Sequence, residues 1–208
     1  MKSIGIICEY NPFHNGHMYH INKIKEMFPD SVIILVMSGN FTQRGDASII
    51  NKWNKTKIAL NHNIDLVIEL PFIFTNQSAD TFAFGACSIL NYLKVDYLVF
   101  GSESDNIDYI KDIVNIEDDK KYQEKVKELL DNGINYPTAL SKALKDFNIN
   151  LSDSSNDLLG ISYVKALKKL NSKITPITIK RTNNYNDKTL TKYITSATSI
   201  RENINKRS

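Results

Sequence analysis

The sequence predicts an α/β fold built on a doubly wound parallel sheet of about five strands, with a helical insertion. Short, uninterrupted apolar runs alternate with helical patterns along most of the chain. A run such as 31–37 is apolar throughout, as expected for a parallel strand that helices cover on both faces. Polar loops follow these runs, and alternating strands and helices favour right-handed crossovers. Together these features are typical of a Rossmann-like sheet.

The elements follow from the apolar periodicity. We expect helices over 16–28, 49–61 and 79–93, and strands over 3–8, 31–37, 65–70, 96–100 and 174–179. Residues 104–150 lack an apolar strand run but carry three amphipathic helical patterns, so they are interpreted as a helical insertion packed on the sheet. Residues 1–103 and 151–208 would then form one domain around it. Within the second segment, the polar turn 152–156 should cap a further helix.

Composition is typical of a soluble globular protein. The chain has 208 residues, 42% of them hydrophobic and 24% charged, which favours one domain with an adequate core. No apolar run approaches a membrane span, and the N-terminus enters a strand without a signal peptide, so we expect a cytoplasmic protein without a membrane partner. Cys8 and Cys87 fit neither a disulfide framework nor a zinc pattern, and we expect both to be small buried hydrophobic residues.

Charge is unevenly distributed along the chain. Residues 1–162 hold 15 Lys and Arg against 21 Asp and Glu, whereas residues 163–208 hold 11 against 2. Such an excess suggests a polyanionic partner, either a nucleic acid or a nucleotide triphosphate. The alternative is a solvated, lysine-rich helix face, which would account for Lys165, Lys168 and Lys169.

The stretch 8–20 is the most informative part of the sequence. It contains His14, His17 and His20, three of the four histidines, between the first strand and the first helix. A helix N-terminus attracts phosphate through its unpaired N–H groups, while Gly16 allows a close turn and Pro12 stiffens its entry. His14 and His17 should face the same side and donate hydrogen bonds to phosphate oxygens as charge develops.

Two other interpretations of these histidines remain. They could be ordinary surface histidines, or nitrogen ligands of a metal ion. No Cys, Asp or Glu nearby completes a coordination shell, and Gly16 suits a turn better than a rigid ligand helix. We therefore predict no protein metal site here.

A second informative stretch spans 195–201. Ser196 or Thr198 can cap a helix that starts there, and Arg201 follows one turn later. Hydroxyl and N–H groups at a helix start, together with an arginine, would make a polyphosphate clamp. An ordinary capped terminal helix is the alternative.

These motifs resemble those of a known superfamily. His14-Asn15-Gly16-His17 resembles the HxGH signature of nucleotidyltransferases, and 195–201 is similar to their ISSTxxR signature, with Thr195 in place of isoleucine and Ala197 in place of the second serine. Further blocks resemble the tRNA(Met) cytidine acetate ligase family in order along nearly the whole chain. They lie at 9–17, 37–41, 65–71, 77–80, 100–103 and 159–163.

The resemblance implies an enzyme that activates acetate with ATP, giving acetyl-adenylate and pyrophosphate, and then acetylates the wobble cytidine of elongator tRNA(Met). His14, His17 and Arg201 would be catalytic, Ser196 and Thr198 would join the ATP site, and Lys168, Lys169 and Arg181 are candidate tRNA contacts. Magnesium is expected with the triphosphate. By the family pattern, the ATP contacts would be Ile7, Cys8, Glu9, Tyr10, Asn11, Pro12, Phe13, His14, Asn15, Gly16, His17, Met18, Tyr19, His20, Gly101, Asn156 and Arg181.

Family members are usually longer than this chain, with a further region that helps to grip tRNA. We therefore expect that C-terminal tRNA-binding region to be absent or truncated, with ATP binding intact. Two alternative functions remain: a small-molecule adenylyltransferase of the same superfamily, or a non-catalytic module that binds nucleotide or RNA.

Overall fold

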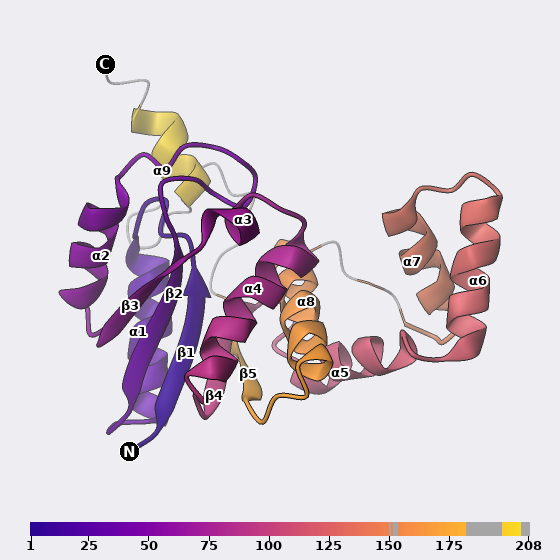
Figure 1. The fold of residues 1–208 in the computed structure, drawn as a ribbon, viewed down its shortest axis with the longest axis horizontal. Coiled ribbons are helices and arrows are strands. Elements are labelled where there is room, and N and C mark those ends of the chain that lie inside the picture. Colours follow the sequence, from indigo (N-terminus) through magenta and orange to yellow (C-terminus); the bar gives the residue numbers. More distant parts are fainter. Residues whose placement is uncertain (150, 152–153, 182–196, 205–208) are drawn as a thin grey trace.

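A five-stranded parallel sheet forms the centre of the computed structural model, which describes residues 1–149, 151, 154–181 and 197–204 (Figure 1). The strand order is β3-β2-β1-β4-β5, so the order reverses between β1 and β4. Each predicted strand is present within about two residues of its expected bounds, and the predicted fold class is confirmed. The strands are β1 (Ser3–Cys8), β2 (Val32–Ser38), β3 (Leu66–Leu70), β4 (Tyr97–Ser102) and β5 (Thr175–Lys180).

Helices cover both faces of the sheet, because alternate residues of the apolar strands point to opposite sides. Ile4 and Ile6 of β1 share one buried cluster with residues of α1 (Asn15–Met27) and α2 (Lys52–Leu60). Ile7 belongs to a second cluster with α4 (Ala79–Tyr92) and α8 (Ser155–Lys169). A Cβ atom at Gly5 would lie 2.7 Å from a Leu90 methyl group, so α4 packs closely over the central strand.

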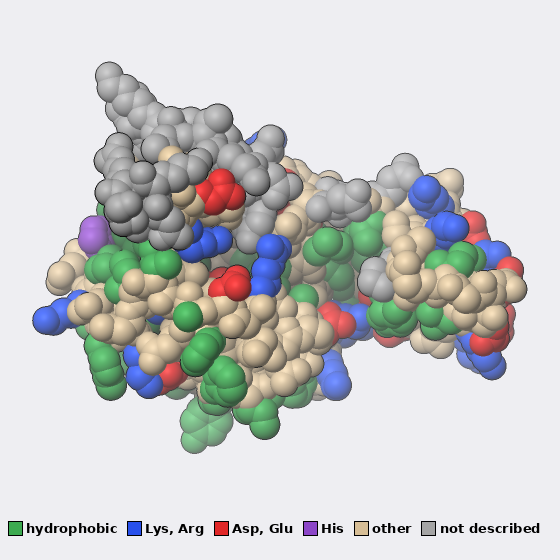
Figure 2. Space-filling model, turned by 90° about the horizontal axis from the view of Figure 1, so that it is seen from above, with side chains coloured by type: hydrophobic (Ala, Val, Ile, Leu, Met, Phe, Trp, Pro, Cys, Tyr) green, Lys and Arg blue, Asp and Glu red, His purple; other side chains and the backbone are tan. Residues whose placement is uncertain are grey.

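The insertion is helical as predicted, and its three helices differ in how closely they pack against the helices that cover the sheet. α5 (Ile107–Ile116) buries Ile110 and Ile113 and packs against α8. α6 (Lys120–Asp131) and α7 (Tyr136–Lys145) pack against each other and lie away from the sheet in two perpendicular views (Figures 1 and 2). The expectation that the whole insertion packs on the sheet was therefore wrong for these two helices.

Two short helices complete the part of the chain that the structure describes. α3 (Phe72–Thr75) follows Pro71 directly after β3, and the sequence did not predict it. α9 (Ala197–Ile204) is the predicted terminal helix and lies above the carboxyl ends of the strands (Figure 1). Within the described residues, no helix is both long enough and apolar enough to cross a membrane.

Candidate functional site

The histidine turn joins β1 to α1 at the carboxyl edge of the sheet. His14 is the N-cap of α1, and its Nδ1 accepts a hydrogen bond from Gly16 N at 3.0 Å. His17 Nδ1 accepts from His14 N at 3.2 Å, and the two rings stack with centroids 3.9 Å apart. Because each Nδ1 is an acceptor, the hydrogen-bond pattern assigns the ring proton to Nε2 in both residues. The turn therefore carries two Nε2–H donors on rings that are inclined by 29° to each other.

These imidazoles are neutral at pH 7. Burial, followed by the positive charge of Arg181, lowers the pKa of His14 to about 4 and that of His20 to about 4. Burial and then the neighbouring histidines hold the pKa of His17 well below its usual value. The histidines can therefore act as neutral hydrogen-bond donors, and no proton needs to move.

Arg201 reaches this turn from the other end of the chain. Its Nη1 donates to the Asn11 carbonyl at 2.6 Å, and its Nη2 donates to Thr198 Oγ1 at 3.2 Å. Thr198 is the second residue of α9, so it orients the arginine and does not cap the helix. Ser196 lies outside the described residues. Arg201 and the histidine turn therefore lie together in the structure.

A second group of side chains lies at the carboxyl ends of β4 and β5. The histidine turn lies on the other side of the point where the strand order reverses. Asn156, in the first turn of α8, donates to Glu103 Oε1 at 2.6 Å, and Arg181 Nη1 donates to Asn156 Oδ1 at 3.4 Å. Arg181 Nε lies 3.7 Å from Glu103 Oε1. A Cβ atom at Gly101 would be 3.2 Å from Arg181 Cγ, so glycine leaves room for this side chain. Gly101, Asn156 and Arg181, which were predicted together, therefore lie together.

Asp157 organises the loop after β4, a role that no sequence pattern indicated. Its carboxylate is 1% exposed and accepts hydrogen bonds from Glu103 N and Ser104 N, both at 3.1 Å. Ser102 Oγ and Ser154 Oγ also donate to it. Burial alone would raise the pKa of Asp157, but these hydrogen bonds lower it overall. Asp157 thus stays ionised and fixes Glu103 beside Asn156.

The loop after β2 packs against the histidine turn. Gln43 N donates to Glu9 Oε1 at 2.6 Å, and Ile49 N donates to Asn11 Oδ1 at 2.9 Å. Lys55 of α2 fixes both loops, because its Nζ donates to Glu9 O at 2.9 Å and to Ser38 O at 2.8 Å. Lys55 is 1% exposed, and burial lowers its pKa. Sequence reasoning missed it, because a lysine within an amphipathic helix ordinarily lies in solvent.

Other candidate residues lie at or below this edge. Ile7 is buried in the core against α4, which leaves only its backbone available to a ligand. Cys8 is partly buried, less than expected, and burial raises the pKa of its thiol to about 11. Cys87 is buried as predicted. Phe13 packs its ring against His17, with centroids 5.5 Å apart, and Tyr10 is buried beneath the turn.

The candidate tRNA contacts do not lie in one place. Lys168 and Lys169 end α8, whereas Asn156 begins it, which separates the two ends by about 18 Å of helix. Lys168 forms an ion pair with Asp118 at 2.6 Å and donates to Val114 O at 3.2 Å. Lys169 Nζ lies over the Phe84 ring at 5.1 Å. Arg181 lies in the group around Asn156.

The comparison with known families gives the class of protein to which this fold and site belong. The chain belongs to the HIGH Nucleotidyl Transferase family, whose profile matches residues 1–208.

Relatives in this family have a more specific name. The chain is 49% identical to the tRNA(Met) cytidine acetate ligase of Acetivibrio thermocellus over 215 residues, covering 98% of this chain and 52% of that protein. It is 48% identical to the same enzyme of Clostridium novyi, covering 98% and 54% respectively. It thus spans about half the length of the curated relatives it matches.

Two solved structures show the same architecture. Thermotoga maritima TmcAL in its apo form aligns with a TM-score of 0.94 and 37% identity, over 100% of this chain and 52% of that one. The same protein bound with alpha-thio ATP aligns with a TM-score of 0.89 and 37% identity, over 100% and 51%.

Proposed function

We propose that this chain binds ATP and activates acetate as acetyl-adenylate, the first step of a tRNA(Met) cytidine acetate ligase. The observation that carries the proposal is the convergence of the His14–His17 pair and Arg201 on one turn at the carboxyl edge of the sheet. The names of the relatives and the alpha-thio ATP complex of TmcAL support the choice of substrates. Ligands of doubly wound sheets bind at this edge, where the strand order reverses.

In this proposal an acetate oxygen attacks the α-phosphorus of ATP, and the bond from that phosphorus to the bridging oxygen of pyrophosphate breaks. Nε2–H of His14 and of His17 would donate to phosphate oxygens whose charge increases in the transition state. Their positions are set in advance by the hydrogen bonds at Nδ1. Arg201 would neutralise the leaving pyrophosphate, with Thr198 orienting its guanidinium.

The rest of the nucleotide would lie over β4 and β5. Gly101, Asn156 and Arg181 line this side, where Asp157 N in the first turn of α8 donates to Glu103 Oε2 at 3.2 Å. Glu103 and Asp157 would act as positioning residues, because they hold Asn156 and Arg181 in place.

Magnesium is expected to accompany the triphosphate. Among the residues that the structure describes, no group of three His, Cys, Asp or Glu side chains is arranged to hold a metal ion. The described side chains therefore do not form a dedicated metal site. We propose that the phosphates themselves supply most of the ligands.

The second step would transfer the acetyl group to RNA. The exocyclic amine of the wobble cytidine of elongator tRNA(Met) attacks the acetyl carbonyl carbon, the bond to the adenylate oxygen breaks, and AMP leaves. The excess of basic residues over 163–208 suits a polyanion. In this proposal Arg181 would contact both the nucleotide and the RNA, whereas Lys168 and Lys169 would contact tRNA only at the far end of α8.

Acetate-dependent release of pyrophosphate from ATP tests this proposal. We expect release that requires acetate, which a small-molecule adenylyltransferase or a non-catalytic binding module would not show. Nucleoside mass spectrometry of methionine tRNA incubated with the protein, ATP and acetate tests the second step separately. Acetylcytidine in the tRNA supports the full ligase activity. Pyrophosphate release without acetylcytidine would limit the activity of this chain to acetate activation.

A further inference from the structure

We propose that a hollow beside the site, at the carboxyl ends of β2 and β3, binds the cytosine base whose amine is acetylated. This inference rests on the proposed function and names the base-recognition residues that it requires. The hollow has a volume of about 230 Å³, and Asn40, Phe41, Glu69 and Phe72 contribute to its walls. That volume is several times the volume that one water molecule occupies in the liquid, yet it is smaller than typical pockets for whole ligands. It therefore suits a single base.

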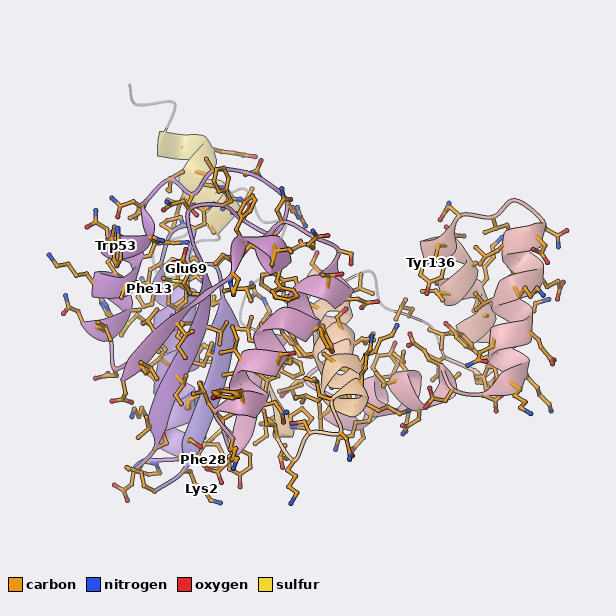
Figure 3. All side chains as sticks on the ribbon, viewed as in Figure 1. Lys2, Phe13, Phe28, Trp53, Glu69 and Tyr136 are labelled. Carbon is orange, nitrogen blue, oxygen red and sulfur yellow. The ribbon has the colours of Figure 1, made fainter. Side chains whose placement is uncertain are left out.

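The hollow is adjacent to the proposed ATP site. β3 is two strands away from β1, which corresponds to about 10 Å across the sheet. The loop after β2 belongs to both places: it supplies Asn40 and Phe41 to the hollow, while Ile49 N donates to Asn11 Oδ1 in the histidine turn. Glu69 lies at the same end of the sheet as Phe13, and Lys2 and Phe28 lie at the opposite end (Figure 3).

Glu69 supplies the chemistry that distinguishes cytosine from uracil. Its side chain is 50% exposed, and Oε2 accepts a hydrogen bond from Lys52 Nζ at 2.7 Å. Oε1 lies over Gly39, where a Cβ atom would collide with it. A carboxylate has about four acceptor positions, so one ammonium group does not saturate it. The exocyclic amine of cytosine is a hydrogen-bond donor that carboxylates accept, whereas O4 of uracil is an acceptor and would be repelled.

Asn40 and two aromatic rings complete the site. Asn40 Oδ1 accepts from Lys52 N at 2.9 Å, which orients its amide group as a donor for the oxygen or ring nitrogen of the base. Phe41 and Phe72 are 43% and 62% exposed, and their ring centroids are 5.5 Å apart. Exposed aromatic side chains of this kind stack on unpaired RNA bases that turn out of a loop.

A larger hollow of about 410 Å³ lies between β3, α3 and α4. Its walls are almost entirely apolar, including Ile68, Phe74 and Ile89, so it offers no group that could tell one base from another. We therefore assign the base to the smaller, more polar hollow.

The test is an NMR titration of the 208-residue protein, saturated with ATP, with cytidine and with uridine. We expect cytidine to shift the backbone amide signals of Gly39, Asn40 and Glu69, and to bind about fivefold or more tightly than uridine. Glu69→Gln should bring the two affinities within about twofold, because an amide can accept from an amine or donate to O4. Glu26→Gln is the matched control, since Glu26 is an exposed carboxylate in the last turn of α1.

Equal binding of the two nucleosides by the wild-type protein would overturn the inference, as would cytidine shifts confined to other residues or an unchanged preference in Glu69→Gln. No detectable cytidine binding would overturn it as well. Acetate-dependent pyrophosphate release, measured on the same samples, separates the two proposals. If both the wild type and Glu69→Gln release pyrophosphate, and Glu69→Gln still prefers cytidine to uridine, only the proposed base site is refuted. If the wild type releases no pyrophosphate, the proposed function itself is refuted.

Discussion

At the scale of single residues, His14 and His17 each use Nδ1 to accept a backbone hydrogen bond, and in the proposed function their Nε2–H groups would donate to phosphate oxygens. The Nδ1 atoms accept the hydrogen bonds that cap α1, so the Nε2–H groups are fixed before any phosphate arrives. A donor fixed in advance does not have to reorganise as charge develops, which is the main source of its catalytic effect. The same ring therefore serves both the helix and the proposed chemistry.

Substitution of His17 can separate these two roles. In His17→Asn, the side-chain oxygen can still accept from His14 N, but no group remains at the Nε2 position. We expect acetate-dependent pyrophosphate release to fall about a hundredfold, or about 3 kcal/mol, with a smaller loss in the free energy of unfolding than in His17→Ala, because asparagine keeps the capping hydrogen bond. His17→Ala should show the same rate and lose about 1 kcal/mol of stability with the cap. Wild-type turnover in His17→Asn would refute the catalytic role.

The low pKa values of the histidines predict how stability depends on pH. His14 and His20 have pKa values of about 4 in the folded protein and about 6.5 when unfolded, so the unfolded chain binds more protons between these values. Stability should therefore fall as pH drops from about 6.5 to about 4, by up to about 1.4 kcal/mol per pH unit for each histidine. Urea unfolding across this range measures the slope. His14→Asn keeps a good N-cap residue and should reduce the slope, and an unchanged slope would contradict this explanation.

At the scale of elements, the site depends on loops that α2 holds together. Lys55 is buried where the loops after β1 and β2 meet, and it donates to a backbone carbonyl of each. Without this donor, two buried carbonyl groups would lose a hydrogen bond, and the histidine turn would lose its support.

Lys55→Met tests this element. Methionine has a similar shape and no donor, so we expect a loss of about 2 kcal/mol in the free energy of unfolding, because unsatisfied buried acceptors outweigh the gain from removing a buried charge. We also expect slower pyrophosphate release, because the two loops would move more independently. Lys57→Met, an exposed lysine on the same helix, is the control and should behave like the wild type. Equal unfolding free energies for the two variants would rule out the proposed support.

Sequence patterns predicted elements well where burial determines the residue type. The strands are continuous apolar runs, so their positions were predicted closely, and the histidine turn follows from its place between β1 and α1. Capping by His14 was not predicted, because Ser, Thr, Asp and Asn are the usual N-caps. Lys55 and Asp157 were missed because charged residues are rarely buried, and only the folded chain shows which acceptors and donors surround them.

At the scale of the whole molecule, the fold brings together segments far apart in the sequence. Arg201 meets Asn11, and Arg181 meets Asn156 and Glu103, all at one edge of the sheet. The parallel topology predicts this meeting in outline, because every strand points its carboxyl end to that edge. It does not predict where an inserted pair of helices lies, since an amphipathic pattern shows that a face is buried but not against which partner.

The α6–α7 pair should behave as a separate unit of stability. Ala139 and Ala143 of α7 are buried, and Tyr122 and Val126 of α6 are buried, but the two helices pack mainly on each other and stand apart from the sheet (Figure 1). Lys, Arg, Asp and Glu side chains are mixed over their surface (Figure 2). A small unit with few partners can open without unfolding the rest.

Hydrogen–deuterium exchange measured by mass spectrometry tests this expectation. Amides of α6 and α7 should exchange through local opening, with protection at least about tenfold lower than in α4 and α8. α5 is the internal control: it belongs to the same insertion, but Ile110 and Ile113 are buried and it packs against α8, so its amides should remain protected. Protection in α6 and α7 equal to that of α4 would mean that the pair unfolds only with the sheet. In that case the contacts between α6–α7 and the body would be stronger than the structure indicates.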